Sequence, residues 1–129
     1  MGDADANDDF HSGSQALIEA LRNGEIPSAL TTDFVLDETV TILGKRHGFG
    51  ADNAAMVADR VMRSPRVFTV YVDETLMKES LKEYPIHKGK LSLTDVTSLV
   101  VMRRYGAKRI FSHDRDFEGL KGIERRESP

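Results

Sequence analysis

Acidic side chains at three separate places in the chain could together hold a divalent metal ion. Glu38 lies in the segment TTDFVLDETVTIL, Asp95 ends the segment LSLTD, and Asp114 and Asp116 belong to the segment HDRDF. Carboxylate oxygens are the ligands that Mg²⁺ and Mn²⁺ prefer. The chain has no cysteine, which excludes a thiol nucleophile and a thiolate metal site. These residue types predict metal-assisted hydrolysis.

Glu38 also has a purely structural interpretation, and the pattern does not choose between the two. On a helix it falls one turn from Phe34, Val35 and Ile42, so it lies at the edge of an apolar stripe. A carboxylate buried there needs a cation or hydrogen-bond donors. A small rotation of the helix would instead turn Glu38 to water beside Asp37.

The other carboxylates occupy positions that favour capping. Ser92 and Asp95 have the spacing of a capping box, and taken singly this role is the better interpretation of Asp95, although Asp95 shares a helix face with Leu99. Asp114 and Asp116 follow a predicted strand, where either could cap a short helix. The combination favours function, because helix starts and strand ends converge at one edge of a parallel α/β sheet.

Other polar residues near this set have weaker functional interpretations. His113 is the obvious alternative base, but no serine or cysteine nucleophile is placed against it, so we interpret it as a solvated turn residue. The basic residues nearby would mostly be solvated, and they are the candidates for phosphate contacts: Lys88, Lys90, Arg103, Arg104, Lys108, Arg109 and Arg115.

Apolar periodicity, caps and turn residues predict the elements that would position these side chains. We expect helices at about residues 10–23, 32–47, 51–63, 73–84 and 92–105. We expect strands at residues 28–31, 67–72, 109–112 and 123–126, and a short helical turn near Phe117. Alternating strands and helices predict a three-layer α/β/α fold with a mostly parallel sheet.

Composition sets broader limits. The 129 residues are 40% hydrophobic and 30% charged, which predicts a single domain over residues 1–129. The acidic residues 1–9 are expected to be a loop or disordered. The net charge of −3 requires a local basic patch for any nucleic-acid contact. No apolar run approaches a membrane span and no signal peptide is apparent, so we expect a cytoplasmic protein without membrane contact.

The segments TTDFVLDETVTIL and LSLTDVTSLVVMRRYGAKRIFSHDRDF, in this order, resemble the PIN-domain family, particularly its VapC-like toxin ribonucleases. The resemblance covers about Phe10 to the C-terminus. It matches Glu38, Asp95 and Asp114 to the family's metal-binding acids, and Asp116 to the aspartate that acts as the acid in some members. It implies a ribonuclease dependent on Mg²⁺ or Mn²⁺, with RNA as substrate, an antitoxin as partner, and a homodimer.

The beginning of the chain departs from the family pattern. PIN domains open with an apolar strand that ends in an aspartate, whereas this chain begins MGDADANDD. We therefore expect the usual N-terminal central strand to be lacking, together with one metal carboxylate. Asp3, Asp5, Asp8 and Asp9 are not assigned its role, because none follows an apolar run. We further expect that the full protein has an upstream segment carrying this strand.

Two alternative functions follow. The first is a non-catalytic PIN-like module, truncated or degenerate, that binds an antitoxin or RNA. The second is a phospho-accepting receiver domain, in which Asp73 would be the acceptor. The receiver interpretation is disfavoured, because the sequence lacks the acidic pair and the well-placed lysine that it requires.

Overall fold

A five-stranded parallel sheet forms the centre of the computed structural model, which describes residues 9–24 and 28–127. The strand order is β3-β2-β1-β4-β5, with β1 in the middle. The strands are β1 (Asp9–His11), β2 (Ala29–Thr32), β3 (Val67–Val70), β4 (Arg109–Phe111) and β5 (Glu124–Arg126). All pairs are parallel, as the alternation of elements predicts.

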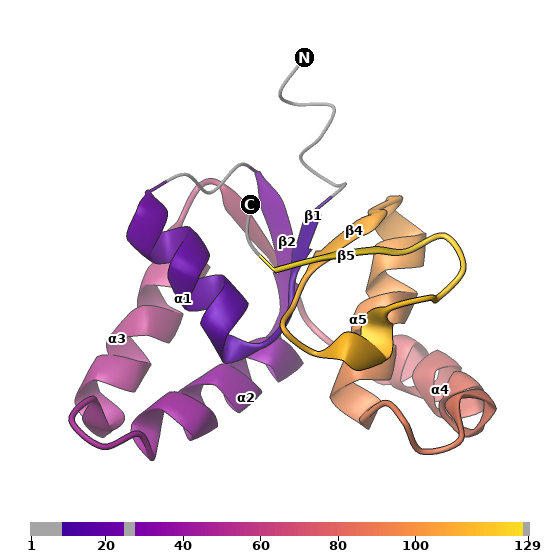
Figure 1. Ribbon diagram of the computed structural model, residues 1–129, viewed down its shortest axis with the longest axis horizontal. Helices are drawn as coiled ribbons and strands as arrows, with labels where there is room; N and C mark the ends of the chain where they lie inside the picture. The colour runs from indigo at the N-terminus through magenta and orange to yellow at the C-terminus, as the bar shows by residue number, and fades with distance from the viewer. Residues whose placement is uncertain (1–8, 25–27, 128–129) are drawn as a thin grey trace.

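Helices cover both faces of this sheet (Figure 1). On one side lie α1 (Ser14–Asn23), α2 (Asp33–Gly44) and α3 (Gly50–Arg63), and on the other lie α4 (Glu74–Glu83) and α5 (Leu93–Tyr105). The short helices η2 (Tyr84–His87) and η3 (Arg115–Phe117) follow α4 and β4. The arrangement confirms the predicted three-layer α/β/α fold.

The central position of the sheet is occupied, which the sequence analysis did not expect. Asp9–His11 forms this strand: Phe10 pairs with Leu30 of β2 on one side and with Ile110 of β4 on the other. The sequence DFH conceals it, because three residues are too few for a visible period and two of them are polar. Both polar side chains are nevertheless buried. The helix predicted from Phe10 therefore begins at Ser14 instead.

The remaining predicted elements are present with boundary shifts of a few residues. The helix predicted over residues 32–47 ends at Gly44, and the strand predicted over residues 67–72 ends at Val70. Pro85 lies just after α4, within the first positions of the short helix η2. Its missing N–H is tolerated there, because the first N–H groups of a helix have no partner within the helix. Residues 1–9 were expected to be a loop or disordered; this is wrong for Asp9, which is the first residue of β1, and residues 1–8 lie outside the described residues.

Two apolar clusters hold the layers together. Phe10, Leu30 and Ile110 pack with α5 on one face, whereas Leu17, Leu36 and Val61 pack between the helices of the other face. Helix α5 is buried nearly all round from Asp95 to Met102, because it lies between the sheet and α4. In the described part of the chain, no helix is long and apolar enough to cross a membrane.

Candidate metal centre at the carboxyl edge of the sheet

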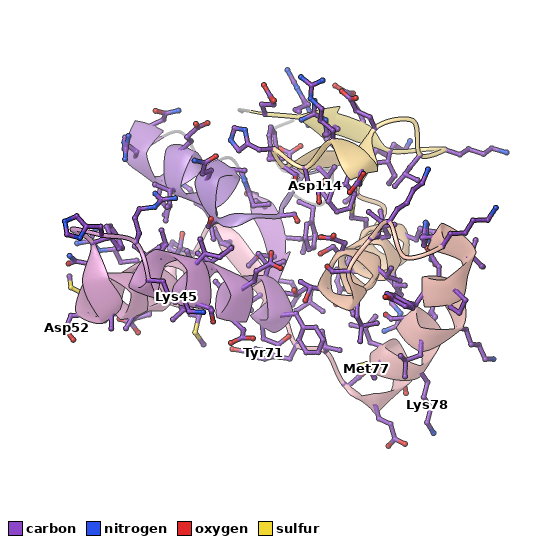
Figure 2. The ribbon with its side chains drawn as sticks, turned by 60° about the horizontal axis from the view of Figure 1, so that its bottom comes forward. Lys45, Asp52, Tyr71, Met77, Lys78 and Asp114 are labelled. Atoms are coloured by element: carbon purple, nitrogen blue, oxygen red, sulfur yellow. The ribbon has the colours of Figure 1, made fainter. Side chains whose placement is uncertain are left out.

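Three of the predicted carboxylates come from elements that meet beyond the carboxyl ends of the strands. Glu38 lies on α2, Asp95 lies in the first turn of α5, and Asp114 follows β4. Figure 2 shows Asp114 at the boundary between the helices on the two sides of the sheet. The first turns of α2 and α5 follow caps at Thr32 and Ser92, whose side chains accept a backbone N–H.

Asp95 forms the predicted capping box. The Ser92 hydroxyl oxygen accepts from the Asp95 N–H at 3.1 Å, and Asp95 Oδ2 accepts from the Ser92 N–H at 3.1 Å. The residue is only 9% exposed. Capping occupies Oδ2 and leaves Oδ1 for another partner, so the structural role does not exclude a functional one.

Asp114 is also a cap, as its sequence context predicts. Its Oδ1 accepts from the Asp116 N–H at 2.9 Å and begins η3, and the Ser112 hydroxyl oxygen accepts from the Asp114 N–H at 3.0 Å. These bonds fix the turn that follows β4. The side chains of Asp114 and Asp116 remain exposed and accessible to solute.

The charges of these carboxylates interact. Burial raises the pKa of Glu38, and the negative charges of Asp95, Asp114 and Asp37 raise it further. Burial also raises the pKa of Asp95; the two hydrogen bonds with Ser92 oppose this rise, and Asp114 and Asp116 add to it. Acidic side chains from α2, α5 and the β4–η3 turn therefore share one negative neighbourhood, which a cation would stabilise.

The donor chemistry fits a hard divalent ion, but the site is not preformed. Among residues 9–24 and 28–127, no three acidic or histidine side chains converge closely enough to hold one metal ion. The central strand contributes no acid at its carboxyl end, where the chain reads His11-Ser12-Gly13. Asp9 begins the same strand, at the opposite edge of the sheet, and pairs with Arg109 at 2.8 Å.

Several of the basic residues named as candidates for phosphate contacts are engaged in ion pairs. Arg103 pairs with Glu83, and Arg104 pairs with Glu79 at 2.8 Å. Arg109 holds Asp9, as described above. His113 is exposed in the turn after β4, as expected, with its Nε2 3.8 Å from Glu19 Oε1.

The sequence analysis did not identify the residues that form a cleft beside Asp114. A cleft of about 300 Å³ adjoins Asp114. It is lined by Gly13, Ser14 and Gln15 around the start of α1, by Ile42 of α2 and Arg46 just after α2, and by Ser112 and His113. The dipeptide Gly13-Ser14 was the available signal, because it begins a helix that has no acid in its first turn. Nothing in the local sequence around Arg46 indicates that it faces this cleft.

Comparison with known proteins agrees with this architecture. The profile of the PIN domain family matches residues 5–123. The 23S rRNA-specific endonuclease VapC20 of Mycobacterium tuberculosis is 34% identical over 104 residues, covering 76% of this chain and 73% of that protein. The crystal structure of Mycobacterium tuberculosis VapC20, described as a Sarcin-Ricin loop cleaving toxin, superposes with a TM-score of 0.74 at 26% identity, covering 90% of this chain and 97% of that chain.

Proposed function

The chain belongs to the PIN domain family and is VapC-like within it, and from this premise we propose that it is a metal-dependent endoribonuclease, the toxin of a toxin–antitoxin module. One observation carries the proposal: Glu38, Asp95 and Asp114 lie on three different elements that meet at the carboxyl edge of the sheet. Burial raises the pKa values of Glu38 and Asp95, and the Asp114 charge adds to both rises. Metal binding is the simplest use of such a cluster at the carboxyl edge of a parallel sheet.

In the proposed mechanism, Glu38, Asp95 and Asp114 would hold Mg²⁺ or Mn²⁺. When bound, the ion would activate water and neutralise charge on the RNA phosphodiester. The chain's own contribution is orientation: the Ser92 backbone N–H donates to the Asp95 carboxylate, and the Asp116 N–H donates to the Asp114 carboxylate, so both carboxylates are held at one edge of the sheet. Asp116 is exposed and is the proposed proton donor to the leaving oxygen.

The same proposal names the partners. RNA is the substrate, and 23S rRNA is the first RNA to test, because VapC20 is described as specific for it. An antitoxin that covers the acidic site and a second copy of the chain are the proposed protein partners. A cytoplasmic location is part of the same proposal.

The change Asp95→Asn tests the mechanism. We expect RNA cleavage with Mn²⁺ to fall by about 100-fold or more, because a charged metal ligand is replaced by a neutral amide. The amide oxygen can still accept the Ser92 N–H, so the fold should survive by circular dichroism. Cleavage is measured on purified rRNA by gel electrophoresis.

Ser92→Ala is the matched control. It removes the hydroxyl that caps α5 but keeps the Asp95 carboxylate, so it should cost about 1 kcal/mol of stability and leave cleavage largely intact. Cleavage that is unchanged in Asp95→Asn, or abolished equally in both variants, would contradict the role of Asp95 as a ligand.

The non-catalytic alternative has its own support, because the carboxyl end of β1 carries no acid and the described side chains do not converge on one ion. Isothermal calorimetry separates the two proposals. Heat on adding Mg²⁺ or Mn²⁺ at millimolar concentration supports the nuclease. Tight binding to the product of the neighbouring gene without any metal heat supports a binding module.

A further inference from the structure

The start of α1 has unsatisfied backbone donors and no side chain that caps them. Its N-cap residue is Gly13, no side chain accepts from the first turn, and the first turn contains no acid. Thr32, Asp73 and Ser92 cap α2, α4 and α5, whereas α3, like α1, has no side-chain cap. The first N–H groups of a helix carry a partial positive charge and attract anions.

The Ser14 hydroxyl is a second and independent donor at the same place. The residue is 7% exposed and lines the cleft beside Asp114. Among the described residues, its side chain forms no hydrogen bond, although the residue is largely buried. The hydroxyl still reaches the cleft, because it is not among the fully buried side-chain atoms without a partner. It can therefore donate to a ligand or to water there.

Arg46 supplies a full positive charge to this cleft. Within the described ranges, its guanidinium has no ion pair, unlike Arg103, Arg104 and Arg109. A second groove of about 210 Å³ shares Gln15 and Arg46 with the first and continues along α1 past Ile18 and Glu19 to Arg22. Glu19 is the one acid of this outer groove, and its carboxylate lies near His113.

We infer that this cleft binds a backbone phosphate of the RNA, held by the α1 N–H groups, Ser14 and Arg46, and that Arg22 binds a phosphate farther along the strand. The inference rests on the proposed function, because it takes RNA as the substrate. Asp114 is one of the residues that line the cleft, so an RNA strand bound there would lie beside the proposed metal-binding carboxylates. The exposed side chain of Ile42 provides an apolar surface for a ribose or base beside the phosphate.

Binding of a short fluorescein-labelled single-stranded RNA in EDTA tests this inference without requiring cleavage. Fluorescence anisotropy is measured at several salt concentrations for the full chain and for Arg46→Gln. Loss of one phosphate contact should weaken binding roughly five-fold near 0.1 M salt and reduce the slope of log K against log salt by about 0.7. Ser14→Ala should weaken binding by roughly two- to ten-fold without changing the slope, because it removes a neutral donor.

Arg60→Gln is the matched control, because Arg60 is exposed on α3 and the change removes the same charge. It should leave both affinity and slope as they are in the unmodified protein. Equal losses in Arg46→Gln and Arg60→Gln would overturn the inference in favour of a general charge effect, as would unchanged binding in Arg46→Gln or no RNA binding at all. Arg46→Lys should retain most of the affinity, which excludes misfolding as the cause of the loss.

A parallel cleavage assay of the unmodified protein with Mn²⁺ keeps the two proposals apart. RNA binding at Arg46 without cleavage supports the cleft and contradicts the nuclease. Cleavage with no effect of Arg46→Gln on binding supports the nuclease and contradicts the cleft.

Discussion

His11 is a polar side chain that is buried without a hydrogen-bond partner among the described residues. It ends the central strand, is fully buried, and stacks on Phe111 with ring centroids 4.8 Å apart. Neither ring nitrogen has a partner in the described structure. Burial lowers the pKa of His11 from 6.5 to about 4. The ring is therefore neutral in the folded protein at neutral pH and contributes by packing.

This residue predicts a loss of stability in acid. Between pH 6.5 and about 4 the unfolded chain binds a proton that the folded chain does not, so stability falls as the pH decreases, by up to about 3 kcal/mol. His11→Phe should flatten this part of the pH profile, because the stacked ring stays and the titrating group is gone. Urea unfolding at a series of pH values measures how the free energy of unfolding of each protein depends on pH.

His47→Gln is the control, because His47 is exposed after α2. Its pH profile should match that of the unmodified protein. An equal acid-induced loss in His11→Phe and the unmodified protein would show that other groups cause it.

At the scale of the element, β1 shows how little sequence a central strand requires. Three residues bridge β2 and β4, and Phe10 is the one apolar side chain among them. The strand is stabilised by its neighbours: Arg109 of β4 pairs with Asp9, and the Thr31 hydroxyl of β2 donates to the His11 carbonyl oxygen at 3.3 Å. The polar side chains of Asp9 and His11 can be buried in this strand because β4 supplies an ion-pair partner for Asp9 and a stacking surface for His11.

Phe10→Ala should therefore destabilise the protein by about 3–5 kcal/mol, because Phe10 is fully buried in the core of the central strand. Phe68→Ala on the edge strand β3 is the matched control. Phe68 is 58% exposed, so its truncation should cost well under 1 kcal/mol. Thermal and urea unfolding measure both. Similar losses in the two variants would contradict the central position of β1.

At the scale of the whole molecule, the acidic side chains at the carboxyl edge of the sheet lower the stability of the fold when they are charged. The raised pKa values of Glu38 and Asp95 favour the folded state at low pH, and this contribution is lost as the pH rises through the folded-state values. At neutral pH without metal, the deprotonated cluster therefore destabilises the fold. A bound cation would reverse this cost.

Glu38→Gln should accordingly raise the melting temperature in EDTA, by an amount corresponding to roughly 0.5 kcal/mol, because it removes one of several repelling charges. In the unmodified protein, Mn²⁺ at about ten times its Kd should add about 1.4 kcal/mol of stability. This metal effect should shrink in Glu38→Gln. Differential scanning calorimetry with and without Mn²⁺ measures both effects.

Glu74→Gln on α4 provides the comparison, because Glu74 is exposed and pairs with Lys78 away from the cluster. Glu74→Gln should not raise the melting temperature in EDTA, and Mn²⁺ should stabilise it as much as it stabilises the unmodified protein. A metal-induced shift that is identical in all three proteins would place the ion elsewhere.

The sequence by itself determined the α/β class and the capping box at Ser92 and Asp95, and it is the source of the proposed carboxylate set. These features are local, since caps, periodicity and turn residues act within a few positions of the chain. Tertiary structure alone decided that Asp9–His11 forms the central strand, that Arg109 neutralises Asp9, and that Arg46 faces the cleft beside Asp114. Each of these depends on a partner far away in the chain, and no local pattern carries information about that partner.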